Sequence, residues 1–317
     1  MSFLTRTGNS WRLFKRSIAV MKDHPKLLFF PAVISLLTLG ILLFFLAPVV
    51  LQPTGHKLTE GAHWQAVADS VFTRESIDQA TADEPSERTN EQLTLTPRGM
   101  VYLAIVYFAS MFLATFFATA FYHEILSALQ GGGVSVMGGL RFAVTKLPAV
   151  LLWSLFAGAI GYLIKTLEQR VGLIGQWVVR LIGITWSVAS VFAIPIIVME
   201  EEKNPLAILK RSGATLKKTW GESLAGFLGI QIGGMLVILA SIALFAVGVF
   251  AAAFLQMPWI IVGTAVLWFC SLFALLYTLS VASNIYRCAL YLFAAEGQIP
   301  GYFDRESMDL AWKIKKS

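Results

Sequence analysis

The chain has 317 residues, of which 56% are hydrophobic and only 14% are charged, with a formal net charge of +6. A soluble domain carries about 25% charged residues, so the composition argues against a water-soluble protein. The apolar runs between the charged segments are long enough to cross a hydrocarbon core of about 30 Å. Because the basic residues flank these runs, as membrane orientation requires, we expect no nucleic-acid partner.

Residues 1–26 are predicted to form a basic amphipathic segment. Apolar residues from Trp11 to Met21 recur at helical spacing, and basic residues occupy most of the remaining positions. Such a helix lies on an anionic membrane face, and His24-Pro25 should end it. The candidate anionic-lipid contacts in this segment are Arg12, Lys15 and Arg16.

Residues 27–296 are predicted to form one helical membrane domain with about six spans, so the expected fold class is all-α and polytopic. The first span covers residues 27–50. Its apolar run is longer than the core of a signal peptide, which is about 7–15 residues. We therefore expect an uncleaved anchor.

The longest polar segment, residues 52–98, holds four Lys or Arg against eight Asp or Glu, a net charge of −4. The stretch from Trp64 to Phe72 fits one amphipathic helix. Residues 73–97 have little apolar content to bury, and we expect them to be flexible. A solvated extracytoplasmic loop is the favoured interpretation, and a binding loop is the alternative.

The second span is predicted at residues 99–121, and His123 and Glu124 follow it. Adjacent residues on a helix point about 100° apart, so these two side chains do not easily share one proton. We expect them to anchor the helix at the membrane interface, with a proton-relay or substrate role as the alternative. A polar connection with a glycine turn at 131–133 then leads to the third span at 147–164.

Residues 165–183 permit two interpretations, because polar residues interrupt a persistent apolar stripe. We favour an interfacial helix that leads into a fourth span at 184–199. The alternative is one long tilted helix with Arg180 inside the bilayer. A charge placed there costs a few kcal/mol unless it snorkels or pairs.

The polar segment 200–222 is predicted to be a second basic amphipathic helix on the cytoplasmic side. Asn204 is a capping residue and Pro205 suits the first helical position. Large apolar residues from Leu206 to Trp220 are expected to fall on one side. The candidate anionic-lipid contacts here are Lys210, Arg211, Lys217 and Lys218. The three acids at 200–202 are expected to face water and to favour the helix start.

The fifth span is predicted at residues 224–250 and holds a close-packing glycine pair, Gly229 and Gly233. The sixth begins at Trp259, and its helix should continue to about residue 295, leaving a tail at 297–317. Polar groups in or near spans are functional candidates by default. Those we single out are His123, Glu124, Arg180, Gln231 and Arg287.

The distribution of Lys and Arg predicts the orientation of the spans. The N-terminal segment carries six, the 200–222 segment five, and the 251–258 turn none. An even number of spans with both termini in the cytoplasm satisfies this pattern.

The sequence contains none of the common motifs for metal binding, nucleotide binding or nucleophilic catalysis. Its four histidines are not arranged with metal-ligand spacing, and no Walker, Rossmann or nucleophile-elbow pattern is present. Cys270 and Cys288 lie about 27 Å apart along one predicted helix, too far for a disulfide. We expect no metal, no cofactor and no enzymatic activity.

Several sequence segments resemble a family of bacterial multi-pass membrane proteins known only as a domain of unknown function. They are Ser10-Trp11 with the run from Lys26 to Pro31, the run from Ile194 to Ser223, and the run from Tyr286 to Tyr291 with Gly297, Pro300 and Phe303. The order of parts is also loosely similar to the membrane domain that accompanies glycerophosphodiester phosphodiesterases. The catalytic barrel of those enzymes is absent, so the resemblance implies an architecture in the bacterial inner membrane and no activity.

Three functions fit these observations, in descending order. The first is a non-enzymatic bundle that binds lipids or partner proteins, since each surface Lys or Arg adds about 1 kcal/mol of attraction to anionic lipid. The second is a transporter or channel for a lipid or small molecule, which predicts a polar cavity that reaches Gln231. The third is a membrane enzyme built on His123 and Glu124. The expected partners are anionic lipids of the cytoplasmic face and an unidentified protein.

Overall fold

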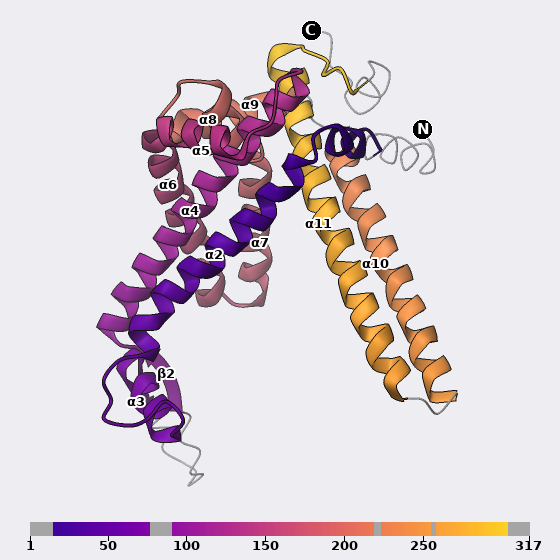
Figure 1. Ribbon diagram of the computed structural model, residues 1–317. Helices are drawn as coiled ribbons and strands as arrows, with labels where there is room; N and C mark the ends of the chain where they lie inside the picture. The colour runs from indigo at the N-terminus through magenta and orange to yellow at the C-terminus, as the bar shows by residue number, and fades with distance from the viewer. Residues whose placement is uncertain (1–14, 77–90, 219–222, 255–257, 304–317) are drawn as a thin grey trace. The chain divides into compact units, whose positions relative to one another are not determined.

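The computed structural model describes residues 15–76, 91–218, 223–254 and 258–303 (Figure 1). The chain is an all-α polytopic protein, as predicted. It divides into two compact units, one of residues Ser35–Ala114 and a larger one of Met1–Ile34 with Thr115–Ser317. Each unit is described by itself.

Five described helices are long and apolar enough to cross a membrane. They are Lys26–Val50, Pro97–Leu129, Leu147–Arg170, Gly175–Met199 and Ile261–Glu296. The predicted fifth span lies in α10, Ser223–Phe254, of which the stretch Ser241–Ala252 is a further apolar helix. The crossing by α10 therefore stays a prediction.

The smaller unit contains more regular structure than the sequence predicted. After α2 (Lys26–Val50) come α3 (Gly61–Val71) and the strands β1 (Phe72–Ser76) and β2 (Glu91–Leu95). The strands pair antiparallel from Phe72 opposite Leu95 to Ser76 opposite Glu91. The prediction that all of 73–97 is flexible was therefore wrong. Short runs of Phe, Thr and Leu suit a pleated surface even when the surrounding segment is polar.

Two helices extend well beyond their apolar spans, and for the second of them this confirms the prediction that the helix continues to about residue 295. The helix α4 (Pro97–Leu129) has 33 residues and α11 (Pro258–Glu296) has 39. At 1.5 Å per residue α11 is about 58 Å long, nearly twice the thickness of a hydrocarbon core. As predicted, α11 ends just before Gly297, which has a positive φ of 67°. The additional turns of both helices are where the chain packs against itself.

The connection predicted as merely polar, 122–146, holds the last turns of α4 and a further helix, α5 (Val136–Thr145). Gly131, with a φ of 82°, makes the turn between them. The hydroxyl of Ser135 caps α5 by accepting a hydrogen bond from the amide of Gly138. Glycine and alanine on one side let α5 lie directly against α4, a pattern that polarity alone does not reveal.

The segment 165–183 is not the favoured interfacial helix, and it matches the alternative only in that the candidate span Gly175–Met199 contains Arg180. The helix α6 runs from Leu147 to Arg170, and α7 (Leu173–Ala189) begins after a two-residue break. The fourth span begins at Gly175, about nine residues earlier than predicted, and continues through α8 (Ala193–Met199). The apolar stripe of α7 faces outward as a lipid-facing surface, so its polar residues do not confine it to the interface.

The pairing of α6 with α7 is aromatic and close. Trp153 stacks on Trp186 with ring centroids 6.2 Å apart. Ser154 and Gly158, one turn apart in α6, are buried, and small residues at this spacing let helices approach closely.

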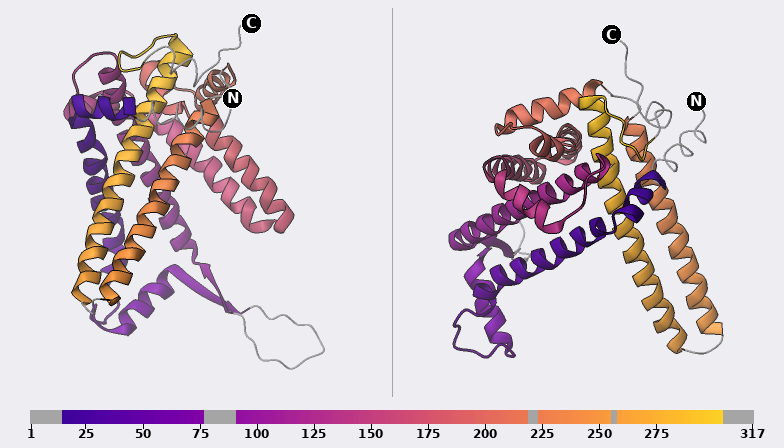
Figure 2. Two further views of the ribbon diagram at one scale, coloured as in Figure 1. Left: turned by 90° about the vertical axis from the view of Figure 1, so that its right-hand side faces the viewer. Right: turned by 45° about the horizontal axis from the view of Figure 1, so that its top comes forward.

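The next helices complete the larger unit. As predicted, α9 (Pro205–Lys218) begins with a cap, in which Asn204 Oδ1 accepts from the amide of Leu206 at 3.0 Å. The helices α10 and α11 then run side by side as a hairpin (Figure 2). Phe245 stacks on Trp268 between them at 4.8 Å.

The N-terminal helix, described from residue 15 to residue 23, has a buried side made of Ser17, Val20 and Met21. At its end the ring nitrogen Nε2 of His24 lies 3.2 Å from the hydroxyl of Tyr302. Desolvation, with the Asp23 carboxylate as a further cause, raises the pKa of Tyr302. One side of the described part of this helix therefore packs on protein, and the rest of the predicted apolar side, from Trp11 to Phe14, lies outside the described residues.

Candidate functional site

The buried core of the larger unit lies where its spans meet the polar segments. Leu27 and Phe30 at the start of α2 are buried, as are Phe121 near the end of α4 and Ile285 in α11. Phe30 stacks on Phe121 at 5.4 Å. Polar side chains lie beside this core, on α4, on α9, on α11, at the end of α8 and between α5 and α6. We call them the polar layer: Tyr122, Glu124, Lys146, Glu200, Arg211, Ser212, Asn284, Arg287 and Tyr291.

Glu200, at the end of α8, joins the largest number of elements in the polar layer. Its Oε1 accepts from Arg211 Nε at 2.6 Å and from the Tyr291 hydroxyl at 3.0 Å. Its backbone carbonyl accepts from Lys146 Nζ at 2.8 Å. The expectation that Glu200 faces water was wrong, because its carboxylate joins α9 to α11. Glu202 keeps the predicted role at the start of α9, where it accepts from the amide of Asn204.

Arg287, one of the predicted interfacial polar groups, belongs to a second cluster in the polar layer. Its Nη1 donates to the Tyr122 hydroxyl at 2.8 Å, and that hydroxyl donates to Asn284 Oδ1 at 2.9 Å. Tyr122 is buried. The cluster joins α4 to α11 and holds the guanidinium where α11 leaves its apolar run.

His123 and Glu124 point to different partners. The imidazole of His123 stacks on Phe142 of α5, with centroids 3.8 Å apart and planes 8° apart. The Glu124 carboxylate is 3% exposed and accepts from the backbone amide of Ser135 at 2.5 Å. A carboxylate at the positive start of α5 is a favourable charge–dipole arrangement. Both residues thus anchor α5, and their geometry does not form an acid–base pair.

A helix break within the fourth span is closed by a side chain that the sequence did not single out. Between α7 and α8 the backbone amide of Phe192 donates to Ser212 Oγ of α9 at 3.1 Å. Both residues are buried. Irregular backbone at membrane depth requires such a partner, since no water is present to supply it. Ser212 lies one helical turn after the buried Ile208. This spacing could have predicted that Ser212 is on the buried face of α9.

The remaining predicted polar groups lie apart from the polar layer. Arg180 donates from Nε to Glu168 Oε1 at 3.0 Å, and its guanidinium lies over the Trp177 ring. This ion pair joins α7 to the last turns of α6. The side chain of Gln231 lies outside the described residues.

The predicted lipid contacts on α9 divide into two groups. Lys210 and Lys217 are exposed, while Arg211, also exposed, is paired with Glu200. The opposite face, with Ile208, Ser212, Thr215 and Leu216, is buried against protein. Of the large apolar residues predicted to share one side of α9, Leu216 is buried and Leu206 is 63% exposed. In the N-terminal segment Lys15 and Arg16 are exposed, and Arg12 and the side chain of Lys218 lie outside the described residues.

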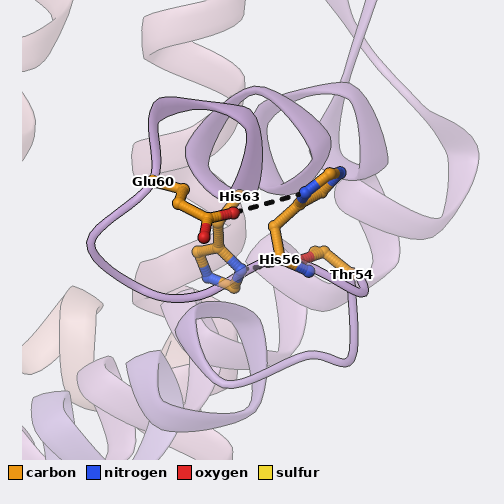
Figure 3. A network of polar contacts seen from close by, with 4 residues as sticks. All are labelled: Thr54, His56, Glu60 and His63. Atoms are coloured by element: carbon orange, nitrogen blue, oxygen red, sulfur yellow. Dashed lines mark hydrogen bonds and ion pairs between the residues drawn. The ribbon is translucent and has the colours of Figure 1, made fainter.

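In the smaller unit a histidine network holds the chain between α2 and α3 (Figure 3). The ring of His63 is buried, with Nδ1 2.7 Å from the Thr54 hydroxyl and Nε2 2.8 Å from the Val50 carbonyl. The carbonyl accepts from Nε2, which leaves Nδ1 to accept from the hydroxyl. His56 and Glu60 lie 3.5 Å apart at the surface. Within the described ranges no group of three His, Cys, Asp or Glu is placed to hold a metal ion.

Residues 98–301 match a family of unknown function, DUF6159. The chain belongs to this family. The match includes the central segment that carried the resemblance and the C-terminal one except for Phe303, and it begins after the N-terminal segment. Neither a curated protein nor a solved structure matches the chain. All nine residues of the polar layer lie in the matched region.

Proposed function

We propose that this DUF6159 protein is a non-enzymatic membrane bundle that binds anionic phospholipid through basic side chains at its cytoplasmic end. The observation that supports the proposal is the docking of α9. One face of this helix is buried against protein, and Lys210 and Lys217 are exposed on the other. Seven residues of helix separate the Cα atoms of Lys210 and Lys217 by about 10 Å along the axis. Because the helix is docked, both side chains extend from the same exposed face.

The proposal includes a location. We place the chain in a bacterial inner membrane with both termini in the cytoplasm, on the distribution of Lys and Arg and on the family resemblance. The loose similarity to the membrane domain that accompanies glycerophosphodiester phosphodiesterases would extend this architecture to a wider group. It carries no activity to this chain.

Transport of a lipid or small molecule is the second candidate, and the break between α7 and α8 is the observation that favours it. Transporters form midplane sites from broken helices whose free backbone groups face the substrate. In this chain the amide of Phe192 is bonded to Ser212 and buried. That bond uses the donor a substrate would need, so we rank transport second.

The test of lipid binding uses the full chain in mild detergent, titrated with phosphatidylglycerol or with phosphatidylcholine and observed by native mass spectrometry. We expect the wild type to prefer phosphatidylglycerol. Removing two surface cations should reduce that preference by about 25-fold, at about fivefold each. The variant is Lys210→Ala with Lys217→Ala.

The matched control removes two exposed cations from the smaller unit, Lys57→Ala with Arg98→Ala. The proposal predicts that this control keeps the wild-type preference. An equal loss in both variants would show a nonspecific charge effect and overturn it. A wild type without preference would also overturn it and would favour a protein partner for the basic face.

A further inference from the structure

The short helix α5 is held at the depth where α4 leaves its apolar run. A Cβ added to Gly139 would stand 2.7 Å from the carbonyl oxygen of Ala120 and 2.9 Å from Cγ of Glu124. The helix α5 therefore lies directly on the last apolar and first charged turns of α4. That transition marks the membrane–water interface of the span.

The face of α5 that points away from α4 carries two exposed apolar side chains with one basic side chain between them. Met137 is 59% exposed and Val144 is 54% exposed. Arg141, also exposed, lies between them at spacings of four and three residues, so all three share one helix face. Gly139 and Ala143 on the opposite face are buried. The exposed face thus combines apolar side chains that suit acyl chains with a cation that suits a headgroup, a composition expected at the interface.

Lipid is the occupant of this face because the exposed apolar surface continues into a membrane span. Leu147, Leu151 and Leu155 of α6 follow α5 directly along the chain, and all three are exposed. They belong to the candidate span Leu147–Arg170, which lipid must cover. Val144 precedes the exposed Leu147 by only three residues and α5 contacts α6, so acyl chains that cover α6 are within reach of α5.

We propose that α5 is an interfacial helix that inserts Met137 and Val144 among the lipids and binds a phospholipid phosphate through Arg141. A guanidinium matches the geometry of a phosphate with two parallel donors. Of the neighbouring basic groups, Lys146 donates to the Glu200 carbonyl and His123 stacks on Phe142. These contacts leave Arg141 as the cation of the exposed face. This site goes beyond the proposed function, which concerns the exposed lysines of α9.

The insertion is tested by spin labelling of the full chain in nanodiscs that contain phosphatidylglycerol. Cys270 is exposed and is replaced by serine, whereas the buried Cys288 stays. Nitroxides are attached in turn to Met137→Cys, Val144→Cys and the control Glu201→Cys, which is an exposed position between α8 and α9. Collisions with oxygen should exceed collisions with a water-soluble nickel chelate at 137 and 144, with the reverse at 201. Water-like values at 137 and 144 would overturn the proposal.

The phosphate contact is tested by comparing Arg141→Gln with Arg141→Lys in the lipid titration. We expect a loss of about fivefold in affinity for phosphatidylglycerol in the glutamine variant, with most of it recovered in the lysine variant. The control is Lys203→Gln, an exposed cation before α9. Equal affinities of Arg141→Gln and wild type would overturn the phosphate role. The nitroxide depths at 137 and 144 do not depend on Lys210 or Lys217. The insertion of α5 is therefore tested even if lipid binding by α9 is disproved.

Discussion

The two halves of α11 are one continuous helix in two different surroundings. Between Pro258 and Ser280 its large apolar side chains are mostly exposed, as with Trp259, Leu267 and Phe269. From Val281 to Phe293 nearly every side chain is buried. The first half is apolar because lipid covers it, and the second because protein does. The second half also carries the polar partners Asn284, Arg287 and Tyr291. We therefore expect substitutions in the packed half of the larger unit to destabilise far more than equivalent ones in the exposed half.

The largest contrast is expected between two glycines. At Gly139 a methyl group would meet the Ala120 carbonyl and the Glu124 side chain at less than 3.0 Å, and Phe30 at 3.1 Å. Gly139→Ala should destabilise the protein by about 3 kcal/mol, because α4 and α5 must separate to admit the methyl group. At Gly263 of α11 the added Cβ meets nothing within 4 Å. Gly263→Ala should be neutral or stabilise by up to about 1 kcal/mol.

The measurement is the thermal midpoint of tryptophan fluorescence for both variants in the same nanodiscs. The comparison fails if the two alanine variants shift the midpoint equally. It also fails if Gly263→Ala is the more damaging of the two.

A pair of serines extends the comparison to single hydrogen bonds. Ser212→Ala leaves the buried amide of Phe192 without an acceptor, which should cost about 2 kcal/mol. Ser271→Ala removes a hydroxyl that bonds within its own exposed helix, to the carbonyl of Leu267. Its effect should stay within about 0.5 kcal/mol. Thermal midpoints again report the difference, and equal small shifts would mean that the helix break tolerates an unpaired amide.

The bond between Glu200 and Tyr291 should show a smaller effect that depends on both partners. Glu200→Gln and Tyr291→Phe should each destabilise by about 1 kcal/mol, since the Tyr291 hydroxyl is enclosed and the carboxylate is partly exposed. The double variant should lose less than the sum, with a coupling of about 0.5 kcal/mol or more. The neighbouring exposed acid provides the control, Glu201→Gln. Strict additivity in the double variant would contradict a direct bond.

The apolar runs alone predicted most of the helices, because a chain in lipid must satisfy its backbone groups within each segment. Hence α2, α6 and the long α11 were anticipated to within several residues at most of their ends. The polar layer was not anticipated. Glu200 contacts Lys146 and Tyr291 only because helices distant in sequence pack together. The periodicity of apolar residues within one helix does not predict such contacts. The exposed face of α9 was predicted in part, because charge marks Lys210 and Lys217. The sequence did not distinguish the exposed Leu206 from the buried Leu216, because an apolar residue looks the same in sequence at either kind of position.

The smallest effect is expected at the ion pair of Arg180 and Glu168, and it tests where the tip of the α6–α7 hairpin lies. Both side chains are more than a third exposed, at 56% and 37%. An exposed pair of this kind contributes about 0.5 kcal/mol, so Arg180→Gln, Glu168→Gln and the double variant should differ little from wild type in nanodiscs.

The result would be different if the pair lay in hydrocarbon. Glu168→Gln would then leave Arg180 as an uncompensated charge at a cost of a few kcal/mol. Adding Arg180→Gln would restore stability, and that rescue would contradict an interfacial position for the pair. Three small and nearly equal shifts would instead place Arg180 within snorkelling reach of water.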